Sequence, residues 1–251
     1  MLALLFVALL LAAWELYAAS GRVDELILPP PSAVGRSLWE DRGLLWENFT
    51  VTAQAIGIGL VLAAAAGVLV AVALHESRTL RRALWPVLLG SQTIPIVLIA
   101  PLLVAWFGFD LRPRLAIVAL VCFFPIAVAM VDGLASVDPE ARKLLRSFGA
   151  SRRQVLRFLE LPAALPSLFT GARLAVGVAA IAAVLAETAG GEVRRGGLGR
   201  IIDVSIGQLE TARAYAAVVV LTLFALALFA ALALAERRLL PWASRPQGPP
   251  A

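Results

Sequence analysis

Residues 51–74 read VTAQAIGIGLVLAAAAGVLVAVAL and contain no charged side chain. An α-helix needs about 17–25 predominantly apolar residues to cross a bilayer hydrocarbon core of roughly 30 Å, and this stretch has that length. Backbone exposed to lipid must satisfy its hydrogen bonds within its own segment, which favours a helix. The stretch therefore predicts a transmembrane helix and sets the class of the whole protein.

Five further apolar stretches of similar length follow the same pattern. They run from Met1 to about Ala19, from about Leu84 to Phe107, from about Leu115 to Val131, from about Leu168 to Ala186 and from about Ala214 to Ala235. The sequence thus predicts an all-α polytopic membrane protein with about six transmembrane helices. We expect a single domain over residues 1–243 and a disordered tail over 244–251. A secretory signal peptide is the alternative for the first stretch, although that stretch lacks a basic start.

The composition is that of a protein surrounded by membrane lipid, and it excludes several classes of function. Hydrophobic residues make up 61% of the chain, charged residues only 16%, and the mean hydropathy is +0.87, beyond what a soluble fold buries. The net charge of +5 would suggest nucleic acid in a soluble protein, but arginines between apolar stretches suit membrane lipid instead. Cys122 and His75 are single residues of their types, which excludes an internal disulfide and cysteine or histidine metal clusters.

The basic residues predict the orientation in the membrane. With the amino terminus in the cytoplasm, the inside loops hold 12 lysines and arginines and the outside loops hold 9. Six of the inside residues fall within residues 142–157. Because basic residues concentrate in cytoplasmic loops, we expect a multi-pass protein of the bacterial inner membrane with both termini in the cytoplasm.

Residues 137–166, called the central loop below, are too polar to span a membrane and have a helical pattern. Asp138 can cap a helix that begins at Pro139, with Glu140 favoured near its positive end. Apolar residues then recur at helical spacing and form one stripe: Ala141, Leu144, Leu145 and Phe148.

Gly149 ends this predicted helix, and Ser151 can cap a second short helix that Pro162 and Pro166 limit. Two interpretations of the pair remain open on physical grounds. The two helices could lie on the lipid headgroups, or they could dock a soluble partner.

A resemblance to a known family enters at this point. Gly149 is followed by nine residues, Leu159, one residue, and Leu161-Pro162. This spacing resembles the permease signature of binding-protein-dependent ABC importers, written E-A-A, three residues, G, nine residues, I, one residue, L-P. The E-A-A positions hold Lys143, Leu144 and Leu145 instead, so the chain lacks the glutamate of this signature.

Other motifs resemble the nitrate, sulfonate and taurine branch of these permeases. They include Leu28-Pro29-Pro30-Pro31-Ser32, Trp106-Phe107-Gly108, Leu161-Pro162-Ala163-Ala164-Leu165-Pro166, Gly171-Ala172-Arg173 and Gly197-Leu198-Gly199. The stretch Val118 to Pro125 is most similar to members that import thiamine-precursor pyrimidines or riboflavin-like heterocycles. The resemblance runs from the first predicted helix to the sixth.

The resemblance implies a type I ABC importer permease fold, in which the central loop is a cytoplasmic coupling-helix loop. Its expected ATPase-coupling residues are Ala141, Leu144, Leu145, Phe148, Gly149, Ala150, Leu159, Leu161 and Pro162.

The chain has no Gly-x-x-x-x-Gly-Lys-Ser/Thr phosphate loop. We therefore expect a transport subunit rather than an enzyme, without a cofactor of its own, and with ATP and Mg on separate ATPase subunits. An extracytoplasmic solute-binding protein is the other implied partner. Two ATPases and one docking loop per chain predict a homodimer.

Four polar residues within the apolar stretches are candidates for the translocation path. Ser91, Gln92 and Thr93 precede Pro95, and Glu187 lies near the outer end of the fifth helix. Plain helix packing is the alternative for each. A secondary transporter would need more intramembrane carboxylates or a repeat, and a membrane enzyme would need a convergent set of reactive side chains.

Overall fold

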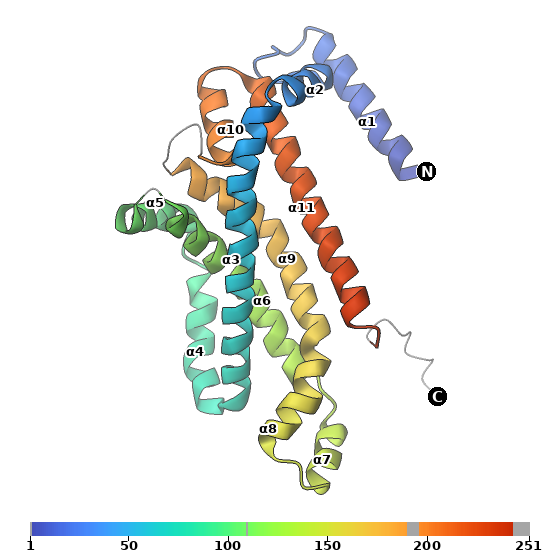
Figure 1. Ribbon diagram of the computed structural model, residues 1–251, viewed down its shortest axis with the longest axis vertical. Helices are drawn as coiled ribbons and strands as arrows, with labels where there is room; N and C mark the ends of the chain where they lie inside the picture. Colours follow the sequence, from blue (N-terminus) through green and yellow to red (C-terminus); the bar gives the residue numbers. More distant parts are fainter. Residues whose placement is uncertain (1, 109, 190–195, 243–251) are drawn as a thin grey trace.

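A computed structural model describes residues 2–108, 110–189 and 196–242, and within these ranges the chain is helical with no strand. Four long helices make up the body of the molecule (Figure 1): α3 (Arg42–Glu76), α6 (Leu111–Ala135), α9 (Leu161–Thr188) and α11 (Thr211–Leu239). The other elements are α1 (Leu2–Ala19), α2 (Pro31–Glu40), α4 (Arg78–Ser91), α5 (Ile96–Phe107), α7 (Pro139–Ser147), α8 (Arg152–Val155), the π-helical turn η1 (Leu156–Glu160) and α10 (Leu198–Gly207). The predicted all-α class is confirmed.

Helix α6 is the centre of the fold, because α3 packs along one side of it and α9 along another. Small residues let the backbones approach closely. A Cβ atom added to Gly59 would lie 2.6 Å from Val118 Cγ1, and one added to Gly171 would lie 2.9 Å from the Ile126 Cα atom. Gly59 of α3 and Gly171 of α9 therefore pack directly against α6, and the Cys122 thiol of α6 is buried against α9.

Helix α11 completes the body and is held to its neighbours near both ends. Arg213 Nε lies 3.0 Å from Asp41 Oδ2 at the α2–α3 junction, and Arg173 of α9 pairs with Glu236 near the other end. Helices α2 and α10 lie at one end of the molecule, and α7 and α8 lie at the opposite end (Figure 1).

The number of spans is lower than predicted when only straight helices are counted. Four helical segments of the described chain are long and apolar enough to cross a membrane. The third predicted stretch is not one straight helix, because α4 and α5 meet at an angle of 96°. Pro95 explains the break: it has no N–H, and it disfavours helical backbone at Ile94. If the bent pair is one span there are five, and α1 is a shorter apolar helix.

The fifth predicted stretch begins earlier than expected. Neither Pro162 nor Pro166 ends a helix, and α8, η1 and α9 form one rod from Arg152 to Thr188. Pro162 lies in the first turn of α9, just after the π-helical turn η1 within this rod. The π-helical turn accommodates the local change in hydrogen bonding. The central loop is therefore continuous with a transmembrane rod.

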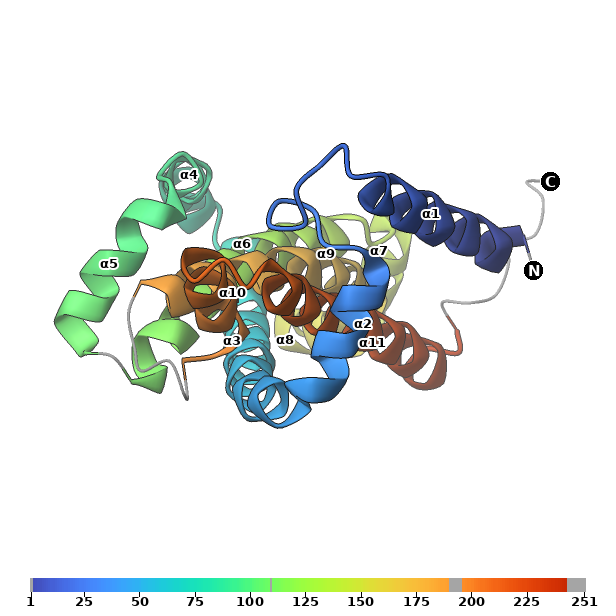
Figure 2. The same ribbon diagram turned by 90° about the horizontal axis from the view of Figure 1, so that it is seen from above.

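Two elements leave the body on opposite sides, as Figure 2 shows for α1 and α5. Helix α1 is tethered through its last turns: Glu15 accepts hydrogen bonds from the backbone and hydroxyl groups of Ser32, and the Trp14 ring packs on Tyr215. The predicted disordered tail at 244–251 lies outside the described residues.

Candidate functional site

The central loop forms the two short helices that the sequence predicts. Asp138 Oδ1 accepts a hydrogen bond from the Glu140 amide at 2.9 Å and caps α7. Gly149 ends the segment at a φ of +82°, a conformation that other L-residues avoid. Ser151 and Gln154 then form a capping box that starts α8. Local hydrogen bonds thus determine the shape of the loop.

The expected coupling residues fall into an exposed and a packed group. Leu144 is 59% exposed and Phe148 79% exposed, while Ala141, Leu145 and Ala150 are partly buried. Leu161 packs against the core cluster around Leu134 and Ala164. Leu159, also partly buried, and Pro162 lie where η1 joins α9. The Leu159, Leu161 and Pro162 positions of the signature therefore pack where the loop joins α9, whereas apolar side chains of α7 remain exposed.

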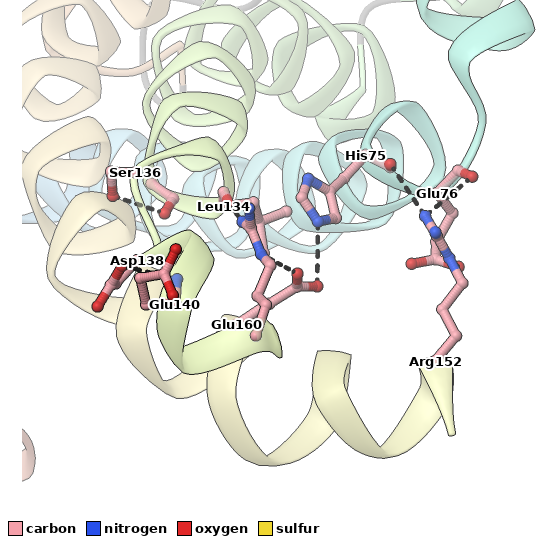
Figure 3. Close-up of polar contacts among 10 residues, drawn as sticks. His75, Glu76, Leu134, Ser136, Asp138, Glu140, Arg152 and Glu160 are labelled. Atoms are coloured by element: carbon pink, nitrogen blue, oxygen red, sulfur yellow. Dashed lines mark hydrogen bonds and ion pairs between the residues drawn. The ribbon is translucent and has the colours of Figure 1, made fainter. Parts of the chain in front are cut away.

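A buried carboxylate that the sequence analysis missed connects the loop to α3 (Figure 3). Glu160 is 6% exposed. Its Oε1 atom accepts a hydrogen bond from Arg142 Nε at 2.6 Å, and its Oε2 atom lies 3.0 Å from His75 Nε2. Arg142 also donates to the Leu134 carbonyl oxygen at 2.8 Å. The glutamate thus joins α7, η1, the end of α6 and the end of α3.

A second ion pair reinforces this connection. Arg152 Nε donates to Glu76 Oε2 at 2.7 Å, and the same guanidinium reaches the Glu76 carbonyl oxygen at 3.2 Å. Arginine near a helix C-terminus also interacts favourably with the helix dipole. One sequence signal could have found Glu160, namely a single acidic residue between Leu159 and Leu161 in an apolar run.

The three polar candidates at 91–93 lie at the break between α4 and α5. The Ser91 and Thr93 hydroxyls donate to carbonyl oxygens of the preceding turn, from Leu88 and Gly90. Ser91 and Gln92 line a surface cavity of about 560 Å³ between this break and α6. All three are exposed in the single chain.

Glu187, near the end of α9, is fully buried. Its Oε2 atom accepts a hydrogen bond from the Gly199 amide at 2.7 Å, and its Oε1 atom accepts one from the Thr52 hydroxyl at 2.8 Å. Thr52 Oγ1 accepts from the Leu198 amide at 2.9 Å, and Asn48 Oδ1 accepts from the Gly197 amide at 3.0 Å. The side chain therefore lines no open path in this protomer.

These contacts make an N-terminal anchor for α10. The amides of Gly197, Leu198 and Gly199, at the start of α10, have no partner within the helix and donate to side chains of α3 and α9. The carboxylate among these acceptors is also stabilised by the positive end of the helix dipole. The sequence analysis missed Asn48 and Thr52. Their signal was their spacing, since they continue the buried face of α3 on which Gly59 and Ala63 lie.

Comparison with known proteins matches residues 59–241 to the family described as binding-protein-dependent transport system inner membrane component. The formylaminopyrimidine transport permease protein of Halalkalibacterium halodurans is 34% identical over 238 residues, covering 95% of this chain and 94% of that protein. The riboflavin transport system permease protein of Chloroflexus aurantiacus is 36% identical over 236 residues, covering 93% and 87%. A solved amino acid ABC transporter, crystallised with histidines, aligns with a TM-score of 0.62 at 16% identity, over 80% of this chain and 97% of that one.

We predict that Gly197→Ala releases α10 from its anchor. Gly197 has a φ of +94°, and an added Cβ atom would lie 2.1 Å from the Glu187 Cδ atom. With a ψ of 172°, this backbone conformation is essentially restricted to glycine and costs about 1–3 kcal/mol for a residue with a side chain, and the carboxylate must also move. A lower melting temperature and faster proteolysis near α10 are expected. Gly207→Ala on the same helix is the control, because no atom lies within 4 Å of its added Cβ. Equal behaviour of the two variants would contradict the anchor.

A second prediction concerns Glu160. Replacing it with alanine removes the carboxylate that pairs with the Arg142 and His75 side chains, which are 23% and 16% exposed, and leaves Arg142 with the Leu134 carbonyl oxygen. Loss of a partly buried charged partner costs roughly 1–3 kcal/mol, so the melting temperature of the purified protein should fall by several degrees. Glu140→Ala removes an exposed partner of Lys143 in the same loop and should change little. The connection to α3 is refuted if both variants melt alike.

Proposed function

Because the chain belongs to the family of binding-protein-dependent transport system inner membrane components, we propose that it lines half of a solute path and that α7 docks on a cytoplasmic ATPase. The chain is a multi-pass inner membrane protein and the permease subunit of an ABC importer for small solutes. Family membership decides for this class over a secondary transporter or a membrane enzyme.

The observation that carries the docking proposal is the exposed part of the apolar stripe on α7. Leu144 of α7 and Phe148, which caps the C-terminus of α7, lie one helical turn apart and are both exposed, and α7 itself has no buried residue. Exposed large apolar side chains at this spacing suit a groove on a partner. The ion pairs of Glu160 and Glu76 fix the loop to the end of α3, and η1 continues directly into α9, so a displacement of α7 would be transmitted to the membrane helices.

The distribution of basic residues supports the proposed orientation. The end of the molecule that carries α7 and α8 also carries the start of α4 and the end of α11 (Figure 1), and these segments hold most of the arginines predicted to face the cytoplasm. Both termini are proposed to be cytoplasmic. Cysteines placed at Arg36 and at Arg81 should be labelled from opposite sides of the membrane.

ATP and Mg are assigned to separate ATPase subunits, because a permease of this kind needs an energy source that its own sequence lacks. A symmetric pair of ATPases is matched by two identical permeases with one docking loop each. The polar residues at 91–93 would then face the shared path, and Glu187 would act on the path by holding α10. Cross-linking should give a dimer of this chain; a partner permease of different sequence would contradict the homodimer.

The proposed solute is a thiamine-precursor pyrimidine or a related heterocycle such as riboflavin. Two relatives covering most of the chain are named as permeases for formylaminopyrimidine and riboflavin, while others are named for taurine and nitrate. A solute-binding protein delivers the solute in such systems. Identifying the ligand of the binding protein that co-purifies with this permease tests the assignment, and a sulfonate, taurine or nitrate ligand would overturn it.

The exposed part of the apolar stripe, Leu144 and Phe148, is called the docking stripe below. Truncating it should uncouple transport from ATP hydrolysis. Phe148→Ala removes an anchor from the ATPase groove, a loss of roughly 2 kcal/mol or more if the ring is buried there, and Gly149→Val disturbs the angle between α7 and α8 because of the positive φ. Both variants should insert normally and recover less ATPase in pull-down experiments. Phe6→Ala is the control, since that ring is similarly exposed on α1. Equal ATPase recovery by all variants would favour a helix that lies on lipid.

A further inference from the structure

A cavity of about 450 Å³ lies between the end of α3, the start of α4 and the central loop. Its volume is within the range of small-molecule sites, about 300–1,000 Å³. Seven of its eight lining residues are polar or charged, and four of them are arginines: Arg78, Arg142, Arg146 and Arg152. The cavity is therefore unlike the apolar surfaces along the membrane helices.

The charges in this cavity do not balance. Glu160 is paired with Arg142 and Glu76 is paired with Arg152, at 2.6 and 2.7 Å. Among the described residues, no carboxylate lies within ion-pair distance of Arg78 or Arg146. With His75 neutral, the lining carries a formal charge of +2, supplied by two arginines that come from different segments, α4 and α7.

The cavity and the docking stripe lie on opposite sides of α7. At 3.6 residues per turn, the Arg142 and Arg146 side is rotated by roughly 200° from the Leu144 and Phe148 side. An ATPase that covers the stripe therefore leaves these arginines facing α3 and α4. This separation favours a small anionic ligand over an acidic side chain of the ATPase.

We propose that this cavity binds a phosphate group, held between Arg78 of α4 and Arg146 of α7. A guanidinium group donates two parallel hydrogen bonds to phosphate oxygens, and a phosphate dianion would neutralise the two unpaired arginines. The bound group would link α7 to the start of α4 and so add a third connection between the central loop and the membrane helices.

Anionic phospholipid and free phosphate are the two sources of such a group. The lipid source agrees with the surroundings, because Arg81 and Arg82 follow on α4 and the Arg81 guanidinium lies 5.9 Å from the Trp85 ring centre. Aromatic and basic side chains gather at the headgroup level. Only the cytoplasmic location of the cavity rests on the proposed function, since the charges and the volume do not depend on it.

The test compares two double variants of the full-length permease. Arg78→Gln/Arg146→Gln removes the unpaired arginines, whereas Arg237→Gln/Arg238→Gln removes the same charge from an exposed site near the end of α11. Binding is measured with inorganic phosphate in neutral detergent and in lipid nanodiscs that contain either phosphatidylglycerol or only phosphatidylcholine. Wild type and the α11 variant should bind alike, and the cavity variant should bind roughly tenfold more weakly or worse.

Each outcome decides the proposal. Binding of inorganic phosphate that the cavity variant loses supports a free anion, and binding confined to phosphatidylglycerol that it loses supports a lipid headgroup. No binding, equal binding by the cavity variant, or equal losses in both variants would overturn the site. It is also overturned if the cavity variant loses the ATPase but keeps phosphate. Should the cavity variant misfold, Arg146→Gln alone is measured in the same way. Because neither probe involves ATP or transport, a negative result leaves the permease assignment untouched.

Discussion

The close approach of α3 and α9 to α6 is the constraint on which the rest of the structure depends. Glycines at the contact bring backbone and side-chain atoms to distances that leave no room for a Cβ atom, at Gly59 against Val118 and at Gly171 against Ile126. Lipid tails offer no hydrophobic force between helices, so such packing holds membrane helices together. Once α3 and α9 lie against α6, the polar ends of these helices are also placed.

Two polar clusters, each built around a buried carboxylate, follow from this placement, one at each end of the bundle. At one end, Asn48 and Thr52 of α3 meet Glu187 of α9 and bind the first amides of α10. At the other end, His75 and Glu76 of α3 meet the arginines and Glu160 of the central loop. The two buried carboxylates, Glu187 and Glu160, both have partners, because an unpaired buried carboxylate would be costly. The three-helix core is therefore connected by hydrogen bonds to the segment at each end.

The helix caps could be predicted from short stretches of sequence, whereas the effect of each proline could not. Asp138, Gly149 and Ser151 behave as their residue types predict, because a cap or a positive φ depends only on neighbouring backbone atoms. Proline was less predictable. Pro95 accompanies a 96° bend where one helix was expected, whereas Pro162 and Pro166 lie inside a continuous rod. The difference depends on how the surrounding turns pack and bond, which residue type alone does not specify.

The sequence by itself determined the membrane class, the helical segments, the spacing of the permease signature and the apolar stripe of α7, because hydropathy, periodicity and caps are properties of short stretches. Only the tertiary structure decided the contacts of Glu187 and Glu160. Glu187, a candidate for the translocation path, bonds to Thr52, 135 residues away, and to the amide of Gly199. Glu160 joins a histidine and an arginine that lie 85 and 18 residues away along the chain. Such partners are brought together by helix packing, so no local pattern reveals them.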